Sequence, residues 1–392
     1  MLFNSIDFLI FFPIVVVFYN VPAFEVLLPV GISFYTFQTL AYTIDVYRGK
    51  LKPEKHLGIF ALYVAFFPQL VAGPIERAKN LLPQFYHKFN FSGNRVVSGL
   101  RLMLWGMFKK VVIADRLAIY VNEVYNNPSE YHGLPIIIAT FFFAFQIYCD
   151  FSGYSDIAIG SARIMGYNIM TNFRQPYFSQ SVAEFWQRWH ISLSTWFRDY
   201  LYIPLGGNRV PKWRWYLNLM IVFVVSGLWH GANWTFIIWG ALHGSYLLIE
   251  IWMKNIRAKI SDLRYLERFS SGQTLLRTLT TFLLIVFAWM FFRAASIGEA
   301  FILIQNMFYI NGFAGINVPW VLHVANPRFE MALSLGLLAF LQGIHFLQNC
   351  NLLKPMFYSQ PRTVRWASYL LLALAIMNFG ISEEIPFIYF QF

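Results

Sequence analysis

Long runs of apolar residues recur along the chain, and short polar segments separate them. The strongest runs are residues 9–19, 24–44, 133–148, 216–229, 236–252, 279–292, 329–346 and 366–379. A helix needs about 20 apolar residues to cross the hydrocarbon core of a bilayer, where the backbone must satisfy its own hydrogen bonds. Several runs approach this length. The pattern predicts an all-α fold, a polytopic transmembrane helical bundle that forms one membrane-embedded domain over residues 1–392.

Lysine and arginine gather in some connecting segments and are missing from others. Residues 48–55, 208–214, 254–277 and 354–365 are basic, whereas residues 123–132, 231–234 and 294–327 contain neither lysine nor arginine. Cytoplasmic loops of membrane proteins carry an excess of basic residues. The basic segments are therefore expected in the cytoplasm and the others on the outer side.

The apolar run at residues 57–72 differs from the others. Pro68 interrupts it, Gly73 and Pro74 close it, and basic loops flank it on both sides. Basic loops on both sides favour a segment that enters the membrane and returns on the same side. Such a re-entrant segment needs protein around its free backbone groups.

Residues 96–122 combine a helical pattern with several charges, namely Arg101, Lys109, Lys110, Asp115 and Arg116. A charge at the centre of a membrane costs about 2.5–3.5 kcal/mol on insertion scales. These side chains are therefore expected to face the protein interior, water or lipid headgroups, and an amphipathic helix at the interface is the alternative. Farther along, Asp150 and Asp156 can pair with neighbouring arginines or contact a substrate.

The composition agrees with a membrane protein. Of 392 residues, 58% are hydrophobic and 12% are charged, and the mean hydropathy is +0.50. The net charge of +11 is assigned to cytoplasmic loops, because there is no basic arm or soluble domain for nucleic acid. Cys149 and Cys350 form no C-x-x-C motif, so the sequence indicates neither a disulfide framework nor a thiolate metal site.

The most polar stretch within this apolar sequence is residues 181–209. Ser181 and Glu184 have the spacing of a capping box, and the pattern predicts one helix from there to about residue 202, before Pro204. In such a helix Trp186, His190 and Ser194 would share one face.

A second histidine, His230, follows a long apolar run in SGLWHGANW. A buried neutral imidazole can act as a general base, although a histidine among aromatic residues is also common as a packing residue. Acylation of a hydroxyl is one reaction that such a base permits, and it also needs a thioester donor and a hydrogen-bond donor for the oxyanion. Contacts to such a donor or oxyanion are expected from His190, Trp186, Ser194, Trp229 and Asn233. Phosphate contacts are expected from Arg188, Arg198, Lys109 and Lys110. No zinc motif, phosphate loop or G-x-S-x-G elbow occurs, and His243 is interpreted as a packing residue, so no metal site is expected.

Several longer motifs occur in a fixed order. They are LLPVGISFYTFQTLAYTIDVYRG, FFPQLVAGPIERAKNLLPQ, QIYCDFSGYSDIAIG, FWQRWHISLSTWFRDYLYIPLGGNR and SGLWHGANW. From about residue 27 onward the sequence resembles the membrane-bound O-acyltransferase family, specifically its bacterial alginate O-acetylation branch. The resemblance implies that His230 matches the essential catalytic histidine and that His190 matches the second histidine of the family signature.

The resemblance also implies a reaction and its partners. An acetyl group from a cytosolic donor, expected to be acetyl-CoA as a substrate with no bound cofactor, would cross the bacterial inner membrane. It would reach a hydroxyl of an alginate-like exopolysaccharide or a periplasmic or extracellular acetyltransferase partner, in contact with membrane lipid. Family members carry further membrane segments before the first motif; here several are expected to be lacking between Tyr19 and Leu27. A glycan or lipid transporter and an inactive scaffold of a synthesis complex are the alternative functions.

Overall fold

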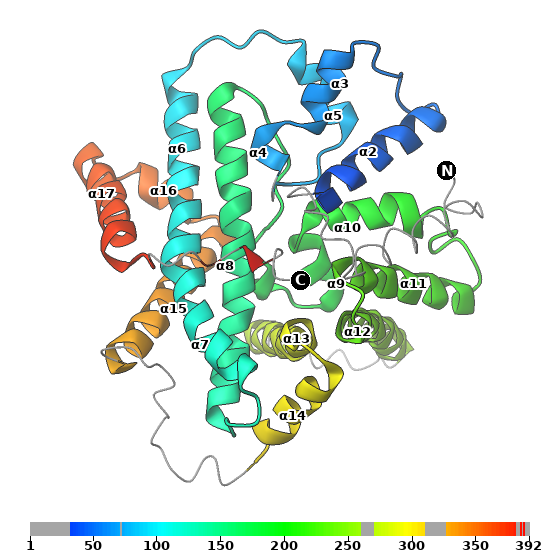
Figure 1. Cartoon of the computed structure of the whole chain (residues 1–392), viewed down its shortest axis with the longest axis vertical. Coiled ribbons are helices and arrows are strands. Elements are labelled where there is room, and N and C mark those ends of the chain that lie inside the picture. Colours follow the sequence, from blue (N-terminus) through cyan, green and yellow to red (C-terminus); the bar gives the residue numbers. More distant parts are fainter. Residues whose placement is uncertain are drawn as a thin grey trace, which may run out of the picture.

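A computed structural model describes residues 32–70, 73–259, 270–309 and 327–381, together with positions 385, 387 and 388, and every regular element in these parts is helical (Figure 1). The elements are α2 (Ile32–Tyr47), α3 (Leu57–Val64), α4 (Phe67–Leu70), α5 (Ala78–Phe85), α6 (Gly93–Met107), η1 (Phe108–Ala114), α7 (Asp115–Asn126), α8 (Leu134–Met165), η2 (Pro176–Phe178), α9 (Val182–Arg188), α10 (Ile191–Phe197), η3 (Arg198–Tyr202), α11 (Lys212–His230), α12 (Trp234–Lys259), α13 (Ser270–Arg293), α14 (Ile297–Met307), α15 (Pro327–Asn349), α16 (Leu353–Tyr358) and α17 (Arg362–Phe379). The predictions for residues 9–19 and for the shortened region after Tyr19 lie outside the described residues.

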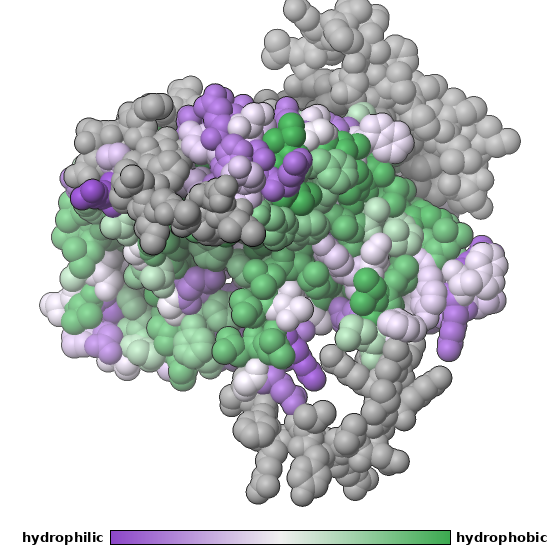
Figure 2. Space-filling view, turned by 90° about the horizontal axis from the view of Figure 1, so that it is seen from below, coloured by the Kyte–Doolittle hydropathy of each residue, from purple (hydrophilic) through white to green (hydrophobic). Residues whose placement is uncertain are grey.

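The helical membrane bundle predicted from the apolar runs is confirmed. Within the described residues, four helices are long and apolar enough to cross a membrane, and they comprise residues Leu134–Met165, Trp234–Met253, Gly272–Arg293 and Pro327–Asn349. Apolar side chains cover a broad part of the surface in Figure 2, with hydrophilic residues toward its edges. Exposed leucines such as Leu279 and Leu283 on α13 belong to this apolar exterior, which suits contact with lipid rather than water.

The segment expected to be re-entrant forms two short helices, α3 with eight residues and α4 with four. At 1.5 Å per residue, neither approaches the ~30 Å needed to cross the hydrocarbon core. His56 caps α3 by accepting a hydrogen bond from the backbone amide of Ile59. The short lengths agree with a segment that does not cross.

Helices α6 and α8 lie side by side and run in opposite directions (Figure 1). Glycines make the close approach possible: a Cβ atom on Gly106 would lie 2.6 Å from the carbonyl oxygen of Gly153. Gly99 meets Gly160 in the same way, again at 2.6 Å. Small residues are the usual means by which membrane helices bring their backbones together.

Four of the five charges in residues 96–122 are buried, as the first of the two interpretations predicted; they are Lys109, Lys110, Asp115 and Arg116, whereas Arg101 is half-buried. Lys109 pairs with Asp156 at 2.8 Å, and Lys110 pairs with both Asp115 at 2.7 Å and Asp150 at 2.9 Å. The aspartates of α8 therefore pair with lysines, whereas arginines were expected. Buried charges in such pairs are compensated, so this cluster is an internal structural element.

The end of the described chain returns to this ionic cluster. The amide of Ile388 donates to Asp150 at 2.8 Å, and Lys110 donates to the carbonyl of Ile385 at 3.2 Å. Phe387 then packs against Phe151, with ring centroids 5.8 Å apart. The last described residues thus pack against α8 at Asp150 and Phe151.

Candidate active site

The polar stretch after Ser181 is not one helix. The helix begins at the predicted place, since Ser181 Oγ accepts the amide of Glu184 at 3.1 Å, although Glu184 accepts the amide of Gln180 rather than that of Ser181. However, α9 ends at Arg188 and α10 begins at Ile191. Between them His190 adopts φ 42° and ψ 54°, a left-handed conformation that is uncommon for residues other than glycine. The prediction that Trp186, His190 and Ser194 share one helical face is wrong, because the helix is interrupted between them.

The interruption turns the ring of His190 into the protein core, where the residue is only 1% exposed. Its Nδ1 lies 3.2 Å from Oδ1 of Asn172. Phe151 packs edge-on against the ring with centroids 4.6 Å apart, and Phe34 stacks on it at 6.3 Å. Its Nε2 atom is buried and has no hydrogen-bond partner in the described structure. His190 is thus held at one nitrogen and left available at the other.

His230 occupies the last position of α11 and is surrounded by aromatic rings. The indoles of Trp229 and Trp239 lie 4.6 and 5.1 Å away, and Phe292 of α13 lies at 5.0 Å. Gly227 lets α11 approach the backbone of α12 at Phe236, where no Cβ would fit. The close crossing of α11 and α12 therefore brings a half-buried His230 against the aromatic core.

The two histidines come from separate elements and meet in one aromatic cluster. Phe34 lies 6.3 Å from the ring of His190 and also 6.3 Å from the ring of Trp229, which contacts His230. His190 lies within electrostatic range of His230. An aromatic surround of this kind excludes water, which strengthens any electrostatic interaction inside it.

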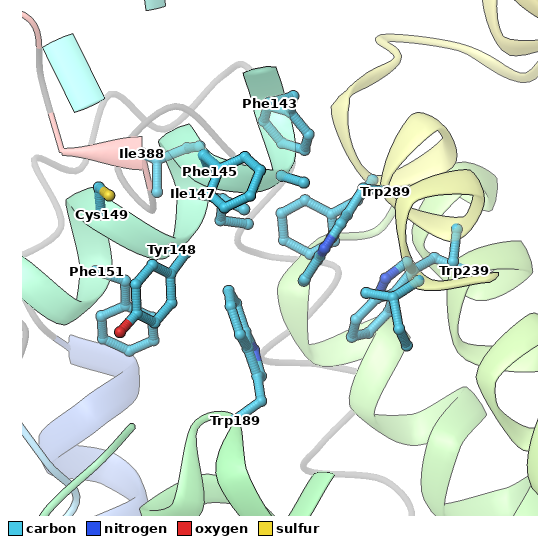
Figure 3. Packing of buried hydrophobic residues seen from close by; sticks show 14 of the residues in the cluster. Phe143, Phe145, Ile147, Tyr148, Cys149, Phe151, Trp189, Trp239, Trp289 and Ile388 are labelled. Carbon is cyan, nitrogen blue, oxygen red and sulfur yellow. The ribbon is translucent and has the colours of Figure 1, made fainter. Parts of the chain in front are cut away.

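Three tryptophans extend this cluster toward α8 and α13. Figure 3 shows Trp189, Trp239 and Trp289 converging beside the buried residues of α8, and the ring of Trp289 lies 5.1 Å from Trp189 and 5.8 Å from Trp239. The Nε1 atom of Trp239 is buried and has no hydrogen-bond partner among the described residues. A buried N–H without a partner calls for an explanation, and this one lies on a ring that touches His230. Trp239 is not among the residues predicted from the sequence, although it lies only four residues before His243.

Other residues expected to contact the donor have their polar atoms engaged. Trp186 donates through Nε1 to His243 at 3.3 Å, and Ser194 donates to the carbonyl of Trp189 at 3.2 Å. Asn233 caps α12 through Oδ1, which accepts the amide of Thr235 at 3.1 Å, and its Nδ2 donates to Ala295 at 2.8 Å. These contacts hold the walls of the cluster in place.

The cations expected to face phosphates divide into two groups. Arg188 pairs with Glu184 at 2.5 Å and donates to Asn349, and Arg198 has a side chain that is 59% exposed beside Asp199. Arg198 is thus exposed, whereas Arg188 is half-buried and engaged by two partners. Lys109 and Lys110 are buried in their carboxylate pairs and do not present a free charge to a phosphate.

Within the described ranges, no three residues among His, Cys, Asp and Glu gather closely enough to hold a metal ion. His243 is fully buried, and its Nδ1 accepts the indole N–H of Trp186. This arrangement fits the packing role expected for it. The sites that the structure offers for chemistry are therefore imidazole and indole nitrogens rather than a ligand cluster.

Comparison with known proteins relates the chain to proteins named for the O-acetylation of alginate and peptidoglycan. It is 37% identical to the probable alginate O-acetylase AlgI of Azotobacter vinelandii over 94% of this chain and 76% of that protein. It is 46% identical to the Pseudomonas aeruginosa protein of the same name over 72% of this chain, and there it spans about half of the relative, 52%. The peptidoglycan O-acetyltransferase of Helicobacter pylori is 33% identical over 94% of this chain and 75% of that protein.

Residues 56–292 match the sequence pattern of the membrane-bound O-acyltransferase family. This range includes both histidines of the aromatic cluster, the tryptophans that surround them, and Phe151 and Phe292. The family resemblance inferred from the motifs is confirmed, and with it the enzyme class of O-acyltransferase. The chain belongs to the membrane-bound O-acyltransferase family.

Proposed function

We propose that the chain transfers an acetyl group from acetyl-CoA on the cytosolic side to hydroxyl groups of an exported polysaccharide. The transfer is direct or passes through an acetyltransferase partner outside the inner membrane of a bacterium. Relatives named for alginate and peptidoglycan O-acetylation, and a teichoic acid D-alanyltransferase of Bacillus subtilis that is 29% identical over 58% of this chain, support a cell-envelope polymer as the acceptor.

The observation that carries this proposal is the meeting of His190 and His230 in one water-poor aromatic cluster. Each histidine lies at the end of a short or apolar helix, and a helical bundle brings together residues that are 40 positions apart. Ionisable residues at membrane depth are costly and usually serve a function.

In the proposed reaction His230 is the general base. The hydroxyl oxygen of the acceptor forms a bond with the thioester carbon while its proton passes to the imidazole of His230. The carbon–sulfur bond then breaks, and the departing thiolate takes the proton from the imidazolium. Positioned base catalysis of this kind contributes about 10²–10⁴-fold in rate.

The oxyanion formed at the thioester carbonyl needs a hydrogen-bond donor. The indole N–H of Trp239 supplies one, because it is buried, has no partner among the described residues and belongs to a ring 5.1 Å from that of His230. A preorganised donor in a dry site costs no reorganisation when the charge develops.

The test is acetyl transfer by membranes that contain the protein and any partner it requires. Radiolabelled acetyl-CoA is added with deacetylated alginate as the probe acceptor, and label in polymer and protein is counted. We expect label in one of these acceptors, and a loss of at least 100-fold in a His230→Gln variant that remains in the membrane at normal abundance. His345→Gln is the control, because His345 is a buried histidine of the same bundle that lies on α15, where it contacts Tyr148.

The alternatives give other results. A transporter would move polymer or lipid without any covalent transfer of label. An inactive scaffold would support the same acetylation level with Gln at position 230 as with His. Either outcome would refute the proposed function.

A further inference from the structure

Asn172 contacts His190 in a way that fixes which ring nitrogen carries the proton. Oδ1 of Asn172 accepts the backbone amide of Ser192 at 3.1 Å and the hydroxyl of Ser192 at 2.9 Å. A backbone amide can only donate, so the atom at this position is the oxygen and not the nitrogen of the carboxamide. The same oxygen lies 3.2 Å from Nδ1 of His190. The hydroxyl of Ser192 also lies 3.5 Å from Nδ1, but its hydrogen is directed to the nearer Oδ1 of Asn172 at 2.9 Å, so both oxygens around Nδ1 are acceptors. We therefore assign the proton of the neutral ring to Nδ1.

We infer that Asn172 is a positioning residue that holds His190 as the Nδ1–H tautomer and so makes Nε2 a proton acceptor inside the aromatic cluster. The effect of this tautomer on acetyl transfer rests on the proposed function. The tautomer itself does not, because it follows from the hydrogen bonds of Asn172. Asn172 is 0% exposed, and the Nε2 atom of His190 is buried without a partner in the described part of the chain.

This tautomer divides the roles of the groups in the cluster. Nε2 of neutral His190 carries a lone pair and no hydrogen, so it can accept a hydrogen bond from a reacting hydroxyl or from His230. It cannot donate one to an oxyanion, which was one of the roles considered for this histidine. The hydrogen bond to the oxyanion must therefore come from an N–H group such as that of Trp239. His190 instead accepts a hydrogen bond or a proton through Nε2.

Asn172 also maintains the backbone that presents the ring. Its carbonyl accepts the amide of Ile191 at 2.9 Å, and its side chain accepts the next amide, that of Ser192. These bonds satisfy the first amides of α10 in place of a local cap and stabilise the left-handed conformation of His190. One residue thus controls both the break in the helix and the proton on the ring.

The obvious substitution, Asn172→Leu, would leave the amide of Ser192 without its acceptor and could prevent folding. Asn172→Asp avoids this problem, because a carboxylate accepts the same three hydrogen bonds. The second carboxylate oxygen would face Ser155, whose hydroxyl lies 3.4 Å from Nδ2 of Asn172 and can rotate to donate. The aspartate variant therefore keeps the tautomer and adds a negative charge next to the ring.

The charge makes a distinct signature in the pH profile. A neighbouring carboxylate stabilises the protonated imidazole and raises its pKa by about 1–3 units, so the rising limb of kcat/KM must move to higher pH. Among the described residues, the other titratable group that acts on His190 is His230. On α8, which contacts the ring through Phe151, Asp150 and Asp156 are already paired with Lys110 and Lys109.

The experiment measures the tautomer directly. Protein labelled with ¹⁵N at histidine is purified in detergent or nanodiscs, and the His190 signals are assigned by comparison with a His190→Asn variant. We expect a protonated Nδ1 and an unprotonated Nε2 in the wild type and in Asn172→Asp, and loss of this preference in Asn172→Leu. Asn218→Leu is the matched control, because Asn218 is equally buried but binds the carbonyls of Leu205 and Gly207.

Acetyl transfer is measured on the same proteins. We expect Asn172→Asp to retain acetyl transfer, with the acidic limb of its kcat/KM profile shifted to higher pH by about one unit or more. We expect the rate of acetyl transfer to fall at least 100-fold in Asn172→Leu. A protonated Nε2 in the wild type, an unchanged tautomer in Asn172→Leu, or an unshifted profile in Asn172→Asp would overturn the inference. If transfer is absent even in the wild type while the tautomer responds as expected, the proposed function fails and the role of Asn172 stands.

Discussion

The imidazole of His230 stands edge-on to the indole of Trp239, with centroids 5.1 Å apart and ring planes at 89°. This geometry gives a direct prediction for Trp239→Phe, which keeps an aromatic ring in the cluster and removes only the N–H and the second ring. We expect kcat for acetyl transfer to fall about 10²–10³-fold, as when one oxyanion donor is removed, with little change in KM.

The control for this variant is Trp196→Phe. Trp196 is also buried, but its indole N–H donates to the backbone carbonyl of Phe37 at 2.9 Å. Its replacement should lower stability by about 1 kcal/mol and leave kcat within threefold. Equal losses of kcat in the two variants would show that the N–H of Trp239 does not stabilise the oxyanion.

A second prediction concerns the left-handed backbone at His190. Asparagine tolerates this conformation, whereas a β-branched residue does not. His190→Asn should therefore lose acetyl transfer with nearly normal thermal stability, and His190→Val should lose both, with about 1–3 kcal/mol of stability lost to strain. Unfolding monitored by the monodisperse fraction after heating in detergent measures the difference, and equal melting temperatures for the two variants would contradict it.

A third prediction concerns the ion pair between Lys110 and Asp150. Lys110→Met leaves two buried carboxylates without their cation, and removing one partner of a buried pair costs about 3–5 kcal/mol. Adding Asp150→Asn and Asp115→Asn should restore part of this loss, because the stranded charges are removed. Arg198→Met, at the exposed pair with Asp199, should change stability by less than about 1 kcal/mol. No recovery in the triple variant would argue against the pairing as the cause.

A fourth prediction compares two glycines inside helices. Gly106→Ala places a methyl group 2.6 Å from the carbonyl oxygen of Gly153, where two backbones meet and neither can yield cheaply. Gly336→Ala on α15 meets nothing within 4 Å, so it should be neutral or stabilise the helix by up to about 1 kcal/mol. The midpoint of thermal unfolding should therefore fall for the first variant and not for the second.

The apolar runs predict most of the membrane helices because their length and composition are set by the lipid, a constraint that acts on each segment alone. The run at residues 236–252, for example, lies within α12. The break at His190 could not be predicted in this way. The local sequence continues a helical pattern through it, and the acceptors that interrupt the helix belong to Asn172, which lies 18 residues earlier.

Other features carried a signal that was not used. Ser296 and Glu299 have the same spacing as Ser181 and Glu184, and the hydroxyl of Ser296 caps α14 at 3.2 Å within a segment interpreted only as an outer loop. The two histidines were selected from the sequence, whereas Trp239 and Asn172 were not, because their importance depends on which nitrogen or oxygen lacks a partner once the helices are packed.

The paired charges of α6, η1 and α8 also constrain how the protein enters the membrane. Lys109 and Lys110 precede the turn between these segments, and Asp150 and Asp156 follow it. Released singly into lipid, α8 would carry Asp150 and Asp156 without their lysines, and the preceding segment would carry Lys109 without Asp156. Each such charge costs about 2.5–3.5 kcal/mol. If the two segments enter the membrane together as a hairpin, with the glycine contacts between α6 and α8 already formed, their charges are paired from the start. The first segment must then wait for the second to be synthesised before it moves into lipid.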